Sequence, residues 1–215
     1  MEVKKEIEVK IKELQSTNIY IIDNVFDDEL CDKLIDYIDS SNTTRLSFSN
    51  KNNVECFSVN NIEQNNVNKF VIENIRKIFE LVTGYNNRIN VAAQTLFELR
   101  KVYGETRLHQ DGVFDMPVSI NDSPTKIRSV RSLTIVITLN DDFDGGVYHF
   151  PNQNVSIKPK KGTAILFPPY YTHPHQVSQI EPGKYRYICS SWGLDDFLAN
   201  DSREKWKYKN FSMNL

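Results

Sequence analysis

The residues of this sequence best suited to metal chemistry are its histidines, of which there are only four. Three of them stand in two short segments, TRLHQDG (106–112) and YYTHPHQV (170–177). Residues two apart on a strand point to the same side, so His109 and Asp111 could present an imidazole and a carboxylate together. A histidine from the second segment would complete a set of two histidines and one carboxylate.

Such a set is suited to more than one metal. It leaves coordination positions open on Fe(II), as a metal that binds both a cosubstrate and O2 requires. Two histidines and a carboxylate can also hold catalytic zinc. An H-x-D pair alone is common in solvated turns as well, so its meaning depends on the rest of the chain.

Two helices are predicted in the first part of the chain. The segment DDELCDKLIDYIDSS (27–41) places its apolar residues on one helical face, with Asp27 as a plausible N-cap. A second helical period runs from Val67 to Val82, and Gly84 is expected just beyond its end. Residues 1–15 could form a helix or an edge strand.

The remaining elements are predicted to be strands and polar loops. NIYIIDNVF (18–26) is a short β-rich run, and Ser40–Asn53 is polar and turn-rich. From Asn90 onward at least six β-rich runs are separated by Gly, Pro, Asn and Asp. Helices followed by strands predict an α+β protein with an antiparallel barrel or sandwich.

Composition and charge argue against several classes of protein. The 215 residues suffice for one substantial core, and the formal charge of −2 gives no electrostatic footprint for nucleic acid. The three cysteines are far apart and form no metal or disulfide framework, which favours a reducing compartment. The N-terminus lacks the apolar core of a signal peptide, and no run is long enough to span a membrane. We therefore expect a soluble, cytoplasmic protein.

Taken in order, the motifs resemble those of the 2-oxoglutarate- and Fe(II)-dependent dioxygenases, and among them the prolyl 4-hydroxylase-like group. The similarity extends from about Asn18 to Trp192, beginning with IYIIDNVFDDELCDKLIDYI. The ordered segments that carry it are HQD (109–111), RSLTIVITLND (131–141), FDGGVYHF (143–150), KPKKGTAILF (158–167), HQV (175–177), GKYR (183–186) and Trp192.

The resemblance implies a ligand set and a cosubstrate clamp. His109, Asp111 and His175 match the metal ligands of the family; His173 is kept as an alternative to His175. A basic residue after the third ligand binds the distal carboxylate of 2-oxoglutarate in the family. Arg186 has the usual spacing from the tryptophan, and Lys184 is its rival.

Four further residues are assigned more weakly. Thr134 aligns with a strand residue that bonds the same carboxylate in some relatives, and Tyr103 could serve similarly or pack in the core. Trp192 is expected to line the pocket, with Lys184 and His173 as other possible pocket residues. His149 is expected to have a structural role rather than to bind metal.

The resemblance also implies a fold and an activity. The expected fold has N-terminal helices (about 1–85) packed on a double-stranded β-helix, or jelly-roll, core (about 90–195), with a tail at 196–215, all in one domain. The expected reaction uses Fe(II), 2-oxoglutarate and O2, with ascorbate as an optional cofactor, to hydroxylate a carbon and release succinate and CO2.

The substrate most in keeping with the resemblance is a prolyl residue in a peptide or protein, with no nucleic acid or membrane partner. The loops Ser40–Asn53 and Val113–Lys126 are expected to act as lids. Two alternatives remain open: the same chemistry on a nucleobase or small molecule, or a binding protein that has lost the chemistry.

Overall fold

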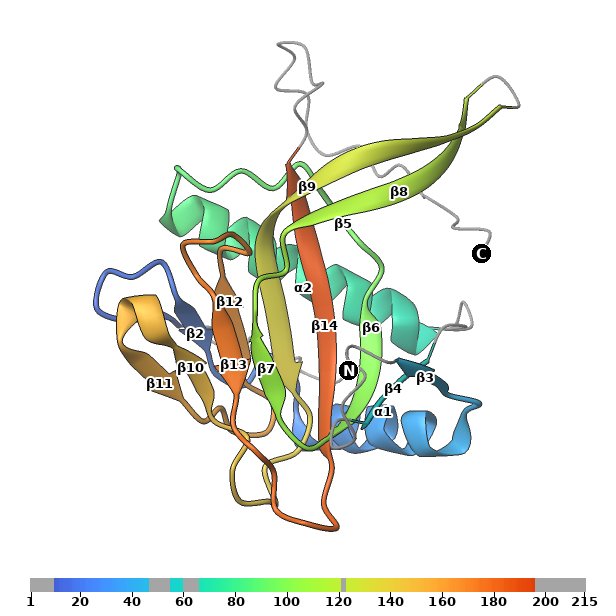
Figure 1. Cartoon of the computed structure of the whole chain (residues 1–215), viewed down its shortest axis with the longest axis vertical. Coiled ribbons are helices and arrows are strands. Elements are labelled where there is room, and N and C mark those ends of the chain that lie inside the picture. Colours follow the sequence, from blue (N-terminus) through green and yellow to red (C-terminus); the bar gives the residue numbers. More distant parts are fainter. Residues whose placement is uncertain (1–9, 47–54, 60–65, 121–122, 196–215) are drawn as a thin grey trace, which may run out of the picture.

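The computed structural model describes residues 10–46, 55–59, 66–120 and 123–195. Two antiparallel sheets and two long helices make up this described part (Figure 1). The helices are α1 (Asp28–Ser40) and α2 (Asn66–Tyr85), and neither combines the length and apolar character needed to cross a membrane.

The larger sheet has ten strands, in the order β1-β2-β12-β9-β14-β6-β4-β3, with β5 paired to β14 and β8 to β9. These are β1 (Ile11–Glu13), β2 (Tyr20–Ile22), β3 (Thr44–Leu46), β4 (Glu55–Val59), β5 (Ala93–Gln94), β6 (Glu98–Tyr103), β8 (Val113–Ile120), β9 (Ser123–Thr138), β12 (Ala164–Phe167) and β14 (Arg186–Asp195).

The smaller sheet has four strands, in the order β11-β10-β13-β7. These are β7 (Thr106–His109), β10 (Tyr148–Phe150), β11 (Val155–Ile157) and β13 (His175–Val177); a short 3-10 helix, η1 (Pro151–Gln153), links β10 to β11. The two antiparallel sheets and two helices agree with the predicted α+β class and are consistent with a jelly-roll core.

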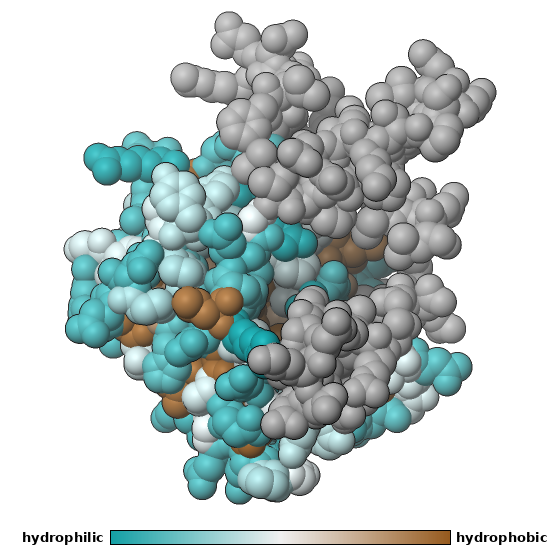
Figure 2. All heavy atoms as spheres, in the orientation of Figure 1, coloured by the Kyte–Doolittle hydropathy of each residue, from teal (hydrophilic) through white to brown (hydrophobic). Residues whose placement is uncertain are grey.

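Two hydrophobic clusters show how the layers pack. Alternate residues of β9 enter different clusters: Ile135 and Ile137 join side chains of α1 and α2, whereas Val136 joins those of the smaller sheet. Strand β14 alternates in the same way, with Cys189 on the helix side and Ile188 on the sheet side. The larger sheet is thus buried on both faces in its centre, which explains the short continuous apolar runs Ile135–Ile137 in β9 and Tyr187–Cys189 in β14. On the face in Figure 2, the described surface is mainly hydrophilic, and brown is confined to small patches.

Helix α1 begins as the sequence predicts. The Asp27 side chain accepts a hydrogen bond from the backbone N–H of Leu30 at 2.8 Å, as an N-cap does. Cys31, Leu34 and Ile38 are its buried residues, spaced on one face.

Helix α2 ends later than predicted. It continues through Gly84 to Tyr85, so the expected end before Gly84 is wrong. The N–H of Asn86 still donates to the Val82 carbonyl at 2.8 Å, and its side chain amide donates to Tyr20 Oη at 2.8 Å. The helix continues beyond its predicted end because Asn86, directly after it, is hydrogen-bonded to Tyr20 of β2.

The predicted loops differ most from the structure. Val113–Lys126 is not a loop: β8 and β9 pair from Val113↔Val130 to Ile120↔Ser123 and form a long hairpin that projects from the sheet (Figure 1). Ser40–Asn53 contains β3, and its residues 47–53 lie outside the described residues.

The first part of the chain is less helical than predicted. Strands β1 to β4 fall within residues 1–85 and all join the larger sheet, with β1 resolving the ambiguity of residues 10–15 in favour of a strand. The predicted tail, 196–215, lies outside the described residues. The proposed division of the chain into a helical part, a β core and a tail therefore stays a prediction.

Candidate metal centre

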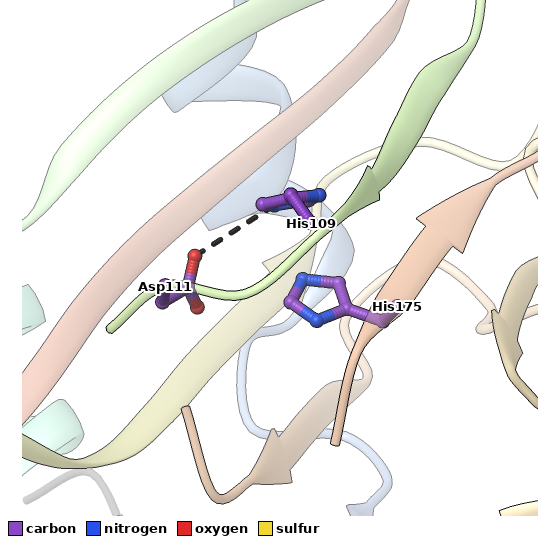
Figure 3. A group of neighbouring side chains, drawn as sticks. All are labelled: His109, Asp111 and His175. Atoms are coloured by element: carbon purple, nitrogen blue, oxygen red, sulfur yellow. Dashed lines mark ion pairs between the residues drawn. The ribbon is translucent and has the colours of Figure 1, made fainter. Parts of the chain in front are cut away.

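The three predicted metal ligands lie together at one end of the smaller sheet (Figure 3). His109 is the last residue of β7 and His175 the first of β13, and the two strands pair with these residues opposite each other. Their ring centroids are 4.3 Å apart. One ligand atom from each histidine and one from Asp111 lie within 4.8 Å of one another. Antiparallel pairing thus brings together residues that are 66 positions apart in the chain.

The position of Asp111 in the site does not follow from the alternation of side chains along a strand. It lies beyond the end of β7, so the same-side argument for His109 and Asp111 does not apply. Gly112 follows with a φ of +57°, a conformation that glycine adopts without strain, and its N–H donates to the Pro169 carbonyl at 2.9 Å. This turn carries the carboxylate back toward the histidines.

The two carboxylate oxygens of Asp111 have different neighbours. The hydroxyl of Thr134, on β9, donates to Oδ2 at 2.6 Å. Oδ1 lies 3.7 Å from Nε2 of His109. Arg131, also on β9, donates to the backbone carbonyl of Asp111 at 3.1 Å. The larger sheet therefore fixes one oxygen and leaves the other facing the histidines.

Backbone carbonyls select the ring nitrogen that each histidine offers. Nδ1 of His109 lies 2.7 Å from the Arg107 carbonyl, and Nδ1 of His175 lies 3.2 Å from the His173 carbonyl. Since a carbonyl only accepts, each Nδ1 must carry the proton, which leaves the Nε2 lone pair available. Metal-binding histidines are commonly oriented in this way.

The environment of His175 favours its neutral form. Burial lowers the pKa of the His175 imidazole to about 4, and the neighbouring His109 acts in the same direction. The ring packs against Phe150 and Phe167, at centroid distances of 5.6 and 4.5 Å. At neutral pH the side chain is therefore uncharged, as a metal-binding imidazole must be, and it lies in an apolar wall.

Arg186 projects from β14 into the space between the sheets. Only 4% of it is exposed. Its guanidinium donates to Tyr148 Oη and, at 3.3 Å, to Thr106 Oγ1, and no carboxylate among the described residues pairs with it. Its Nε is buried without a hydrogen-bond partner in the same part of the chain. A buried cation without an anion is costly, so this position is suited to an anionic group.

Lys184 has a different environment from Arg186. It is half-exposed and forms an ion pair with Asp142, with 3.1 Å between Nζ and Oδ2. Its charge is thus already paired at the surface, which favours Arg186 of the two predicted cosubstrate contacts.

The other two histidines are engaged elsewhere. Buried His173 has Nε2 2.7 Å from the Thr17 carbonyl and Nδ1 2.9 Å from Thr172 Oγ1, so neither nitrogen is available to a metal. His149 Nδ1 lies 2.8 Å from Ser156 Oγ across the smaller sheet. These contacts disfavour His173 as a ligand and give His149 a structural role.

Three weaker assignments have mixed outcomes. Thr134 lies beside the three candidate ligands and donates to Asp111, and its predicted contact with a cosubstrate stays a prediction. Tyr103 packs against Tyr185, 5.9 Å away between centroids, on the helix side of β6 rather than in the space that holds Arg186. Trp192 is buried beside the site, with the Arg131 guanidinium 3.9 Å from its ring centroid.

Three residues of the site were not predicted. Tyr148 and Thr106 hold the guanidinium of Arg186, and Arg131 bonds the backbone of Asp111. Tyr148 and Thr106 come from the smaller sheet and Arg186 from the larger one. Their contact depends on how the sheets face each other, which no local pattern encodes.

The donor set fits Fe(II). Two imidazole nitrogens and one carboxylate oxygen, with no fourth protein ligand in the described cluster, correspond to the set that leaves positions open on non-haem iron. The buried Arg186 fits an anionic cosubstrate beside that site, close enough that its charge helps to lower the pKa of His175.

Comparisons with known proteins agree with this geometry. The family model of the 2OG-Fe(II) oxygenase superfamily matches residues 100–193. Of the site residues described above, this range leaves out only Thr17. A putative prolyl 4-hydroxylase of Acanthamoeba polyphaga mimivirus is 33% identical over 76 residues, 35% of this chain. The match spans 26% of that relative's length.

Solved structures share the fold at low sequence identity. A viral collagen prolyl hydroxylase from Paramecium bursaria chlorella virus 1, a 2OG complex, has a TM-score of 0.56 at 21% identity, covering 83% of this chain and 96% of its own. A Trichoplax adhaerens prolyl hydroxylase in complex with a hypoxia-inducible-factor peptide fragment has a TM-score of 0.61 at 17% identity, covering 85% and 86%. A Pseudomonas putida prolyl-4-hydroxylase has a TM-score of 0.59 at 15% identity, covering 84% and 94%. These matches show a shared fold, and together with the family model and the mimivirus relative they confirm the predicted resemblance.

Proposed function

We propose that this chain, which is similar to the prolyl 4-hydroxylase-like 2-oxoglutarate- and Fe(II)-dependent oxygenases, is itself a 2-oxoglutarate-dependent dioxygenase. The observation that carries the proposal is the convergence of His109, Asp111 and His175, with both Nδ1 atoms engaged by backbone carbonyls. Nothing in a non-catalytic binding protein requires that arrangement.

The chemistry divides between the bound groups and the protein. Bound Fe(II), with 2-oxoglutarate and O2, supplies an oxidant strong enough to hydroxylate an unactivated carbon, with succinate and CO2 as co-products. The protein holds the metal through Nε2 of His109 and His175 and a carboxylate oxygen of Asp111. Thr134 keeps that carboxylate in place by its hydrogen bond to Oδ2.

Arg186 is the proposed partner of the distal carboxylate of 2-oxoglutarate. Its guanidinium is buried and oriented by Tyr148 and Thr106, so little side-chain freedom is lost on binding. Phe150 and Phe167, around His175, limit the access of water to this side of the metal. The proposed scaffold is the double-stranded β-helix, with α1 and α2 packed on its larger sheet.

The proposed substrate is a prolyl residue in a peptide or protein. The support is the similarity to prolyl hydroxylases, of which one structure contains a bound peptide fragment. Ascorbate as an additional reductant and a cytoplasmic location remain part of this proposal.

The proposal is tested by an assay for substrate hydroxylation and succinate formation. Purified protein is loaded with Fe(II) and incubated with 2-oxoglutarate, ascorbate and a library of proline-containing peptides, and mass spectrometry follows the gain of one oxygen together with succinate. Protein carrying His109→Ala is the control. We expect oxidation at proline only with the unaltered site. Oxidation of methylated oligonucleotides or small molecules instead would keep the chemistry and replace the substrate, whereas failure to bind Fe(II) would refute the proposal.

A further inference from the structure

His173 lies two residues before the third metal ligand and is one of the few buried polar residues that the proposed chemistry does not use. Its exposed fraction is 5%. The imidazole stands between the loop that leads to β13 and the turn between β1 and β2, and its two nitrogens contact Thr172 and Thr17.

The contact with Thr17 joins two segments that each contain backbone hydrogen bonds of their own. In the β1–β2 turn, Leu14 N–H donates to the Ile19 carbonyl at 2.9 Å and Thr17 N–H donates to the Leu14 carbonyl at 3.0 Å. The carbonyl of Thr17 is therefore held in place, and it accepts from Nε2 of His173 at 2.7 Å. Since a carbonyl only accepts, His173 is in the Nε2–H form, and Nδ1 accepts from the Thr172 hydroxyl.

The loop held by His173 leads directly to the metal site. The backbone carbonyl of His173 accepts from Nδ1 of His175 at 3.2 Å, which is the bond that orients the ligand ring. Farther back in the same loop, the Pro169 carbonyl accepts from the N–H of Gly112, next to Asp111. A shift of this loop would thus disturb two of the three ligands.

We infer that His173 is a positioning residue: by anchoring the loop to the β1–β2 turn, it fixes the carbonyl that orients His175. The role deepens the proposed function, because it presumes that His175 binds a metal. It also links the start of the described chain, outside the matched residues 100–193, to the metal centre.

The test measures metal binding without any substrate. Calorimetry gives the affinity for Mn(II), a redox-stable probe of an Fe(II) site, and electron paramagnetic resonance of bound Mn(II) reports its coordination symmetry. We expect His173→Ala to weaken Mn(II) binding about 10-fold or more, in the range found for residues that orient metal ligands. The resonance spectrum should broaden or change shape. His173→Gln, which restores an N–H donor toward the Thr17 carbonyl, should recover most of the affinity.

A matched control separates positioning from general destabilisation. Leu34→Ala removes a side chain buried in the other hydrophobic cluster, between α1 and the larger sheet. It should lower the thermal unfolding temperature while leaving the Mn(II) affinity and spectrum unchanged.

The outcomes are distinguishable. If folded His173→Ala binds Mn(II) like the unaltered protein, the positioning role is refuted and the proposed function stands. The same holds if Leu34→Ala weakens binding as much as His173→Ala does, because the effect then follows stability alone. If the unaltered protein binds no Mn(II) or Fe(II), the proposed function itself fails, and this inference fails with it.

Discussion

Thr134 of the larger sheet donates a side-chain hydrogen bond to the carboxylate of Asp111. Its hydroxyl bonds Oδ2 of Asp111, whereas Thr138, four residues farther along the same face of β9, has a buried hydroxyl with no partner among the described residues. The two threonines therefore offer a comparison of the same chemical change at two equally buried positions.

We predict that Thr134→Val weakens Mn(II) binding by about 10-fold, because the carboxylate loses the bond that orients it. The change is nearly isosteric, so the packing of β9 is retained. Thr138→Val should leave the Mn(II) affinity unaltered. Calorimetry on both variants checks this, and equal affinities would show that the Thr134 bond does not orient the ligand.

Arg186 and Lys184 allow a second residue-level comparison. Replacing Arg186 by Met removes a buried cation, and we expect the Michaelis constant for 2-oxoglutarate to rise by about 10–100-fold, as for a lost charge-assisted hydrogen bond. Lys184→Met removes an exposed cation already paired with Asp142 and should have little effect. The measurement is succinate formation as a function of 2-oxoglutarate concentration, and the opposite ranking would transfer the role to Lys184.

At the scale of elements, the end of α2 shows where a local signal was misleading. Glycine near the end of a helical period usually marks a left-handed terminal residue. Here Gly84 lies inside the last turn, and the helix continues to Tyr85 because Asn86 is tied to Tyr20 on β2. That tie is a tertiary contact between residues 66 positions apart, which the helix sequence does not contain.

Gly84→Ala is expected to stabilise the protein by about 0.5–1 kcal/mol, since alanine is favoured over glycine within a helix. An added methyl group there meets no atom within 4 Å. Gly162→Ala is the contrasting variant, because its φ is +76° and a methyl group would lie 2.3 Å from the Phe26 carbonyl oxygen. Urea unfolding of both variants checks the prediction; a loss of stability in Gly84→Ala would mean that α2 ends before that residue.

At the scale of the whole molecule, the sequence was most informative where chemistry depends on residue type. His109, Asp111, His175 and Arg186 were named because the ordered motifs resemble those of the dioxygenase family, and the structure brings the first three together. Their partners were missed, because the bonds from Thr134 to Asp111 and from Arg186 to Tyr148 cross between sheets.

The hairpin of β8 and β9 shows the same limit for the fold. Its sequence, with Pro117 and Pro124 and many polar residues, is typical of a loop, because proline donates no ladder hydrogen bond. Strand β8 nevertheless pairs over its whole length with Ser123–Val130 of β9. Pairing with a neighbour outweighs local propensity, and the neighbour is defined only by the topology.

The hydrophobic interior should also protect two cysteines. Cys31 and Cys189 have no exposed surface, and burial raises the pKa of the Cys31 thiol to about 11 and that of Cys189 as well. We expect iodoacetamide at pH 8 to leave both unmodified in the folded protein and to alkylate both in denaturant, as checked by peptide mass spectrometry. Because the unfolded thiols ionise first, their contribution to stability should decline as the pH rises above about 9.

Metal binding should stabilise the whole fold, because the ligands are assembled only in the native state. At a free Mn(II) concentration about 100 times the dissociation constant, the gain is about 2.7 kcal/mol. Thermal unfolding with and without Mn(II) measures it, and a chelator should reverse it. In His109→Ala the shift should be much smaller; an equal shift would place the bound ion elsewhere.

The position of Arg186 has a consequence for how the two sheets can open. Its hydrogen bonds to Tyr148 and Thr106 connect β14 of the larger sheet to β10 and β7 of the smaller sheet. A second connection lies at the candidate metal site, where Asp111 accepts from Thr134 of β9 and faces His109 and His175. The first connection is built into the protein, whereas the second would be completed by the metal ion of the proposed function. Removal of a bound ion should therefore loosen the segments around His109 and His175 more than those around Arg186. The amide hydrogens near β13 should then exchange with solvent before those beside β14.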